Sequence, residues 1–490
     1  MFGGRRQSKT ILITGATSGI GLELAKLYSS QELVLIGRKA LDELDDSIFN
    51  ENNYCQTDLS QAGFLAKITN FLQKQNIDLI DLVIQNAAIG YFGELNSQNN
   101  IDELLKTNLY APIALSHALL PKLSANGKIV FINSIAANLP AAEYSVYAAS
   151  KAALAGFARN LALEEAKKIQ TIYLGAVKTD MHKKSGVPEA RFKFDKFPSV
   201  SKTTKQIVSI IKSNQREHTI GTINQITRRA GKYGLVDILS KNPAKTKTKV
   251  CAITGAASGI GRALLAEYLA KGFKIIAIDR DENSLVKLKN SNISVIVADL
   301  ASDKDLEKLV NELGSVDIFI HSAGISAVGR FIKTDLAKQK AVLDVNLRAV
   351  LILTKELLAR NKISKGGSIV FVSSLSHQAS YPGAAVYAAS KDGISSFARS
   401  LRFYLKDVHV LTVYPGPTRT PHAAKYSPDN SNEDKRMLPA VLAKKIYNSV
   451  EQQKSSLVPS FALKVFARAG TYFPYLTEQL MLKTLYNKMK

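Results

Sequence analysis

The chain has 490 residues, of which 46% are hydrophobic and 22% charged, a composition typical of folded protein and too apolar for a disordered one. At roughly 100 to 250 residues per domain, this length excludes a single compact core. The 65 Lys and Arg residues exceed the 41 Asp and Glu residues, and the net charge of +24 points to an anionic ligand, partner or surface. Two cysteines cannot build a disulfide framework or a cysteine-based metal site, and no metal is expected. No apolar run approaches the ~20 residues of a transmembrane helix, which predicts a cytoplasmic protein that is soluble or peripheral to a membrane.

The sequence contains one unit twice. KTILITGATSGIG at Lys9–Gly21 returns as KVCAITGAASGIG at Lys249–Gly261, a shift of 240 positions. The same shift relates Ser134, Tyr147 and Lys151 to Ser374, Tyr387 and Lys391. A period this long belongs to whole domains and not to a solenoid. We therefore predict a first domain at 1–239 and a second at 250–490, joined by the basic linker SKNPAKTKTK at 240–249.

Short runs of Ile, Val and Leu alternate with longer helical patterns in each copy. Continuous apolar strands separated by helices indicate a parallel sheet that is covered on both faces. The predicted fold is therefore a doubly wound α/β domain of the Rossmann type, present in tandem. The expected strands are 11–14, 33–36, 82–84 and 128–133 in the first copy, and 250–254, 274–278, 318–320, 368–372 and 408–413 in the second.

A glycine turn follows the first strand of each copy and precedes a helix. Glycines there permit positive φ and let the backbone approach a pyrophosphate at the helix N-terminus. The spacing is GxxxGxG, and its occurrence in both copies favours a dinucleotide site over a merely structural turn. The candidate residues are Gly15, Ser18, Gly19, Ile20 and Gly21, and then Gly255, Ser258, Gly259, Ile260 and Gly261.

The end of the second strand predicts which nicotinamide cofactor each copy takes. A carboxylate there binds the ribose 2′-hydroxyl and repels a 2′-phosphate. The first copy ends this strand with Arg38 and Lys39, which favours NADP, although both cations could instead be solvated surface residues. The second copy ends it with Asp279 and Arg280, which favours NAD.

YAASK occurs late in both copies and pairs Tyr147 with Lys151 and Tyr387 with Lys391. Residues four apart share one face of a helix, so the ammonium lies beside the phenol. A neighbouring cation stabilises phenolate, and we therefore expect the lysine to bring the tyrosine pKa down from about 10 toward neutrality. Ser134 and Ser374 follow apolar strands 13 residues upstream and can reach the same pocket.

Together these motifs resemble the short-chain dehydrogenase/reductase family, and the resemblance covers nearly the whole chain as a tandem pair. It implies an oxidoreductase that transfers hydride between a nicotinamide and a secondary alcohol or ketone. Tyr147 and Tyr387 would then exchange the proton, with a lysine, a serine and an asparagine around each. The implied catalytic sets are Asn108, Ser134, Tyr147 and Lys151, and Asn346, Ser374, Tyr387 and Lys391.

The resemblance also implies further cofactor contacts. Asp58 and Asp299 would contact adenine, and Thr179 and Thr420 the carboxamide end of the nicotinamide. The family's NNAG segment is QNAA and HSAG here, and Leu174 stands where the family has proline. His321 in the second segment is expected to be a packing residue. The remaining implied contacts are Asn86, Ala87, Leu300, Ala323 and Gly324.

The regions expected to cover the substrate differ between the copies. Residues 180–202 are cationic and aromatic, whereas 421–438 are polar, so the substrates or reaction steps should differ. From Lys183 to Lys232 there are 12 cations against 3 acids, which is either a solvated face or a surface for an acidic carrier or an anionic membrane. The amphipathic segment from Phe461 to Lys490 could lie on a membrane or pack on its own domain. A nucleic-acid partner is not expected.

Three alternatives remain open at this stage. The enzyme could reduce a 3-oxoacyl or lipid ketone bound to a carrier or to coenzyme A, or one half could be an inactive cofactor-binding scaffold. The chain could also be a peripheral membrane protein. Because family members commonly dimerise through the helices that carry Asn and YxxxK, we expect the two halves to form that dimer within one chain.

Overall fold

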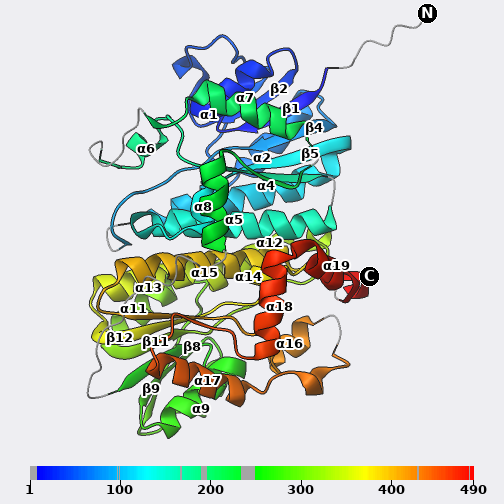
Figure 1. Cartoon of the computed structure of the whole chain (residues 1–490). Helices are drawn as coiled ribbons and strands as arrows, with labels where there is room; N and C mark the ends of the chain where they lie inside the picture. Colours follow the sequence, from blue (N-terminus) through cyan, green and yellow to red (C-terminus); the bar gives the residue numbers. More distant parts are fainter. Residues whose placement is uncertain are drawn as a thin grey trace, which may run out of the picture.

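Two seven-stranded parallel sheets form the framework (Figure 1). The computed structural model describes residues 8–95, 98, 100–165, 168–188, 196–213, 215–232, 249–427, 430–484 and 486–489. The first sheet has the order β3-β2-β1-β4-β5-β6-β7 and the second β10-β9-β8-β11-β12-β13-β14. Every strand pairing in both sheets is parallel. The predicted tandem Rossmann fold is confirmed.

Each sheet reverses its direction of growth between its first and fourth strands, which is the place where doubly wound folds bind ligands. The strands of the first half are β1 (Thr10–Thr14), β2 (Glu32–Gly37), β3 (Tyr54–Gln56), β4 (Ile80–Gln85), β5 (Leu123–Ser134), β6 (Ile169–Leu174) and β7 (Glu217–Thr219). Those of the second half are β8 (Val250–Thr254), β9 (Lys274–Asp279), β10 (Ile293–Val297), β11 (Val316–His321), β12 (Ile363–Val372), β13 (His409–Val413) and β14 (Ser456–Leu457).

Helices cover both faces of the sheets, since both faces of each parallel strand are apolar. In the first half α1 and α7 contribute Leu24 and Ile207 to the core on one face, and α2 and α5 contribute Ile68 and Phe157 on the other. The helices there are α1 (Gly19–Leu27), α2 (Phe64–Lys74), α3 (Ile101–Leu105), α4 (Ala111–Leu119), α5 (Ser145–Glu164), α6 (Met181–Lys184), α7 (Val200–Ile211) and α8 (Thr222–Lys232).

The second half repeats this arrangement and adds a terminal helix. Its helices are α9 (Gly259–Ala270), α10 (Glu282–Val286), α11 (Asp303–Glu312), α12 (Leu336–Leu343), α13 (Ala349–Ala359), α14 (Ser376–Ala379), α15 (Ala385–Tyr404), α16 (Pro421–Tyr426), α17 (Pro439–Glu451), α18 (Phe461–Tyr472) and α19 (Pro474–Thr484). Within the described ranges, none of the helices combines the length and the apolar character that crossing a bilayer requires.

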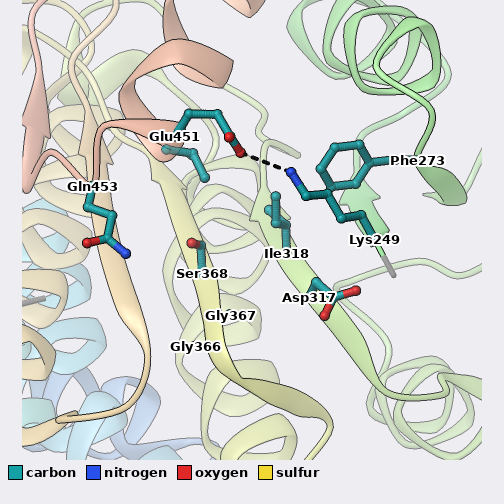
Figure 2. A pocket seen from close by; sticks show the side chains of 10 residues that line it. Lys249, Phe273, Asp317, Ile318, Gly366, Gly367, Ser368, Glu451 and Gln453 are labelled. Atoms are coloured by element: carbon teal, nitrogen blue, oxygen red, sulfur yellow. Dashed lines mark hydrogen bonds and ion pairs between the residues drawn. The ribbon is translucent and has the colours of Figure 1, made fainter. Parts of the chain in front are cut away.

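Lys249 is the first described residue before the second sheet. Its side chain lies over the ring of Phe273, 5.1 Å from the centroid, and pairs with Glu451 at 3.5 Å (Figure 2). The cavity drawn there is only about 60 Å³ and lies at the amino ends of the strands, so it is not a substrate site. The predicted linker 240–249 lies outside the described residues except for Lys249, and the predicted domain limits stay a prediction.

The two halves are packed together through α5 and α15, which lie side by side in the middle of the molecule (Figure 1). Glycines allow the close approach, because a Cβ on Gly156 would collide with the Asp392 side chain and one on Gly393 would come within 3.2 Å of Ala153. Arg159 pairs with Asp392 across this contact at 2.7 Å. Further along, Arg348 pairs with Asp102 at 2.6 Å.

Candidate active site

The glycine turns fit a dinucleotide pyrophosphate. Gly15 and Gly19 have φ of +66° and +54°, values that favour glycine, and a Cβ on Gly21 would collide with the carbonyl oxygen of Gly15. Ser18 and Ser258 begin α1 and α9 without forming a side-chain cap, so neither serine occupies the first N–H groups of its helix. Such N–H groups suit an anion.

A threonine at the end of each first strand secures this turn, and sequence reasoning missed it. The Thr14 hydroxyl accepts hydrogen bonds from the N–H groups of Asn86 and Ala87, at 3.0 and 3.1 Å. Thr254 does the same for Ser322 and Ala323, at 3.1 and 3.2 Å. The repetition of a threonine before both glycine turns was the available signal.

The ends of β2 and β9 differ as the sequence predicts. The Asp279 carboxylate lies beside the glycine turn and accepts a hydrogen bond from Ala257 N–H at 3.0 Å. Gly37 takes the equivalent place in the first half, where a Cβ would collide with the Thr17 side chain. Arg38 is exposed and lies 3.6 Å from Glu103.

Four further cofactor candidates fall into two groups. Thr179 and Thr420 lie against the glycine turns, because a Cβ on Gly19 or Gly259 would come within 3.5 or 3.4 Å of them. The carboxylates of Asp58 and Asp299 instead accept hydrogen bonds from backbone N–H groups two residues further on, at 2.8 and 3.0 Å. Those two carboxylates stabilise local turns at the ends of β3 and β10.

The predicted tyrosine, lysine and serine meet at the carboxyl ends of the strands in both halves. The Lys151 ammonium lies 5.9 Å from the centroid of the Tyr147 ring and donates to Ile132 O at 3.3 Å. The Lys391 ammonium lies 5.7 Å from the Tyr387 ring and donates to Val372 O at 3.0 Å.

Burial dominates the ionisation of these groups. It raises the pKa of Tyr147 to about 12, and a hydrogen bond with Ser134 acts in the opposite direction. The pKa of Tyr387 rises to about 12 for the same reason, with Ser374 opposing the rise. Burial also lowers the pKa of Lys151 to about 8. The expected lowering of the tyrosine pKa is thus not seen, because loss of hydration outweighs the hydrogen bond with the serine.

Asn108 and Asn346 lie in π-helical turns, Lys106–Tyr110 and Asp344–Arg348, which often mark functional sites. The Asn108 side chain accepts from Ile89 N–H at 2.9 Å and donates to Ile89 O at 2.8 Å. It also donates to Ser150 Oγ at 3.2 Å, and Asn346 makes the same bond with Ser390. Ser150 and Ser390, the fourth letter of each YAASK segment, are further residues that sequence reasoning missed.

Aromatic side chains lie against the predicted catalytic tyrosine of each half. Tyr144 packs edge-on against Tyr147 with centroids 5.7 Å apart. In the second half Tyr381 and His422 lie 6.2 Å from Tyr387. Burial lowers the pKa of His422 to about 4, with Lys391 and Lys425 acting in the same direction, so its imidazole is neutral near pH 7.

Each half holds the loop that leads to the other half's predicted catalytic tyrosine. Asn160 accepts a hydrogen bond from Tyr381 N–H at 2.5 Å, and Ser400 accepts one from Ala141 N–H at 3.2 Å. The contacts are equivalent, because Asn160 and Ser400 lie 240 positions apart, and so do Ala141 and Tyr381. Glu164 has no counterpart of its type, because Tyr404 stands 240 positions later.

His321 is a packing residue, as predicted. It is buried, stacks on Phe371 with centroids 5.1 Å apart, and hydrogen-bonds Thr354 at 3.0 Å. Burial lowers its pKa to about 3. Cys55 and Cys251 are both buried and free. The described part of the chain contains no cluster of His, Cys, Asp and Glu suited to a metal ion.

The fold and the two sites define a tandem oxidoreductase with dinucleotide-type glycine turns. The family model for short chain dehydrogenase matches residues 9–189 and again 249–431. The chain therefore belongs to the short-chain dehydrogenase family and is an enzyme of that oxidoreductase class.

Individual relatives each match about one half of the chain. Dehydrogenase/reductase SDR family member 7B of Xenopus laevis is 28% identical over 276 residues, which is 50% of this chain and 85% of the relative. The 3-oxoacyl-(acyl-carrier-protein) reductase of Rickettsia prowazekii is 32% identical over 173 residues, 34% of this chain and 72% of the relative. Among solved structures, 4-hydroxyisoleucine dehydrogenase complexed with NADH is 29% identical, covers 43% of this chain and 95% of its own, and has a TM-score of 0.39.

Proposed function

We propose that both halves catalyse hydride transfer between a nicotinamide cofactor and a secondary alcohol or ketone. The observation that carries this proposal is the presence, in each half, of tyrosine, lysine and serine around one pocket edge, next to a glycine turn shaped for a pyrophosphate. A bound nicotinamide would supply or accept the hydride. The protein would supply the geometry and the proton.

The state of the tyrosines favours proton donation. With a pKa of about 12, the Tyr147 hydroxyl keeps its proton near pH 7 and can give it to a carbonyl oxygen that is becoming an alkoxide. Ser134 would hold the carbonyl oxygen by a hydrogen bond. Lys151, whose pKa burial lowers to about 8, carries its charge near pH 7 and can stabilise the phenolate that remains. Asn108 positions the backbone at Ile89 beside this pocket.

We assign NADP to the first half and NAD to the second. Asp279 supports the second assignment, because its carboxylate lies against the glycine turn where it can accept a ribose hydroxyl and repel a 2′-phosphate. The first half has Gly37 in that place and Arg38 next to it. Different cofactors favour opposite directions, with one half reducing and the other oxidising.

The test uses two full-length variants, Tyr147→Phe and Tyr387→Phe, in a substrate screen with each cofactor. Each substitution should lower only its own half-reaction, by about 10²- to 10⁴-fold. Tyr268→Phe removes a buried tyrosine hydroxyl from the second half's core and serves as the control. The two-reaction proposal fails if either catalytic variant alone abolishes all activity. A variant that leaves every wild-type reaction unaffected, with cofactor still bound, would identify its half as a scaffold.

A second candidate is the reduction of a 3-oxoacyl group on an acidic carrier protein. It is favoured by the 32% identity to the Rickettsia prowazekii 3-oxoacyl-(acyl-carrier-protein) reductase and by the net charge of +24. Carrier-bound substrates should then be preferred over free thioesters, and the preference should vanish at high salt.

We also propose that the α5–α15 contact is this chain's internal version of the family's dimer. Buried apolar residues of both halves form one cluster there, including Phe157 and Phe397, and Arg159 with Asp392 adds an ion pair. The protein should therefore be monomeric in solution by light scattering. A dimer that persists on dilution would count against this proposal.

A further inference from the structure

Two equivalent helices leave apolar and cationic side chains together on the surface. In α8, Ile223 and Ile226 are 79% and 65% exposed, and in α18, Phe461 and Val465 are 81% and 50% exposed. Arg229 in α8 and Lys464 and Arg468 in α18 are exposed beside them. The sequences of both helices contain no Asp or Glu. Apolar residues with cations and no acids are typical of helices that lie in the interface of an anionic membrane.

Both helices lie on the same side of the molecule. Figure 1 shows α8 and α18 on the near side of the molecule, in front of the layer formed by α5 and α15. Each packs next to its own active site, α8 on the turn 135–138 that follows Ser134 and α18 on α14, which follows Ser374. A flat surface could therefore meet both helices at once and lie close to both sites.

A basic cavity lies at the start of α18. It measures about 260 Å³ and is lined by Lys445, Lys454 and Lys464 together with the polar residues Asn448, Ser449 and Gln452. No acidic residue is among its described lining residues. It is smaller than the roughly 300–1,000 Å³ of sites for drug-sized ligands, so a compact anion fits it and a dinucleotide does not.

The cavity and the exposed apolar residues are continuous. Lys464 belongs to both, since it lines the cavity and lies between Phe461 and Val465 on α18. The N-terminus of α18 adds its partial positive charge at the same place. An occupant that fits must therefore carry a small anionic group directly beside apolar chains.

We propose that α8 and α18 dock the protein on an anionic lipid bilayer, with a lipid phosphate headgroup in the cavity lined by Lys445, Lys454 and Lys464. This inference goes beyond the redox reaction and does not depend on it. It gives a role to part of the positive charge that the cofactor phosphates leave unused. Both active sites would then lie next to the lipid surface.

The experiment is sedimentation of the full-length protein with phosphatidylcholine vesicles, with and without phosphatidylserine. The protein should pellet only with the anionic vesicles. The triple variant K445Q/K454Q/K464Q should bind more weakly by about fivefold per cation, on the order of a hundredfold in total. Phe461→Ser with Val465→Ser should weaken binding at unchanged charge. The control K287Q/K289Q/K304Q removes the same charge from exposed positions on the α10–α11 side and should bind normally.

Several outcomes would overturn the proposal. Equal pelleting with both vesicle types would show that binding does not depend on an anionic headgroup. An equal loss of binding in the control variant would show that the overall positive charge, and not the cavity, determines binding. Inorganic phosphate bound by the cavity without vesicle binding would make it a free-anion site. Light scattering that shows a dimer broken by the Phe461 and Val465 substitutions would assign the surface to a second copy. Cofactor fluorescence checks that each variant is folded, so failure here leaves the proposed activity standing.

Discussion

Glu164 lies at the end of α5 and links the first half to two backbone segments of the second half. Its carboxylate accepts hydrogen bonds from Phe331 N–H at 2.8 Å and Gly383 N–H at 3.1 Å, both in the second half. Burial raises its pKa from 4.5 to about 7, with Glu165 acting in the same direction, while the two backbone bonds and Arg330 oppose the rise. Replacing Glu164 with glutamine removes the titrating carboxyl group and keeps the size and shape of the side chain.

The sign and size of the effect follow from this pKa. Below about pH 4.5 the carboxyl is protonated in both the folded and the unfolded chain, so its raised pKa takes nothing from the free energy of unfolding there. Between about pH 4.5 and about pH 7 the unfolded chain ionises first, so the free energy of unfolding falls as the pH rises. At about 1.4 kcal/mol per pKa unit, the loss reaches up to about 3 kcal/mol.

The assay is urea unfolding of the full-length wild type and of Glu164→Gln between about pH 5 and about pH 8. The variant loses one good acceptor, which costs about 1 kcal/mol at every pH. It should therefore be the less stable protein at the acidic end and match or exceed the wild type at the basic end. Glu165→Gln removes a neighbouring carboxylate that is only a minor cause of the raised pKa, and it should change the pH slope far less than Glu164→Gln.

A stability difference between wild type and Glu164→Gln that stays constant from about pH 5 to about pH 8 would refute this reasoning. Such a result would mean that water or Arg330 compensates the charge. An equal change of slope in Glu165→Gln would assign the effect to general charge on the helix end.

Three further outcomes test the sites. Gly261→Ala should abolish cofactor binding in the second half and leave binding in the first half unchanged, as measured by cofactor fluorescence. The reason is that the new Cβ would collide with the Gly255 carbonyl. Asp279→Ala should weaken NADH binding by about 10- to 100-fold and raise NADPH binding, as measured by fluorescence titration. Asn160→Ala should impair only the Tyr387 reaction, and Ser400→Ala only the Tyr147 reaction. Each substitution leaves a backbone N–H group of the other half without its hydrogen-bond acceptor. Equal effects of one variant on both reactions would indicate general destabilisation.

Sequence patterns predicted the fold because parallel strands are apolar on both faces and because a glycine turn between a strand and a helix is typical of dinucleotide-binding folds. They also placed Tyr147 and Lys151 together, since spacing of four on a helix fixes their relation. Thr14 and Ser150 were missed because a hydroxyl at a strand end or in a helix is ordinary. The direction of the pKa shift of Tyr147 could not be predicted, because it depends on whether burial or neighbouring groups dominate. Burial is a property of the packed structure.

The duplicated unit separates what the fold requires from what each reaction requires. The glycine turn, the threonine before it, the asparagine in its π-helical turn and the serine that it contacts occur with the same geometry in both halves. Asp279 against Gly37 and Glu164 against Tyr404 do not. Because the backbone is common to both, the proposed differences in cofactor, substrate and response to pH would arise at positions such as these.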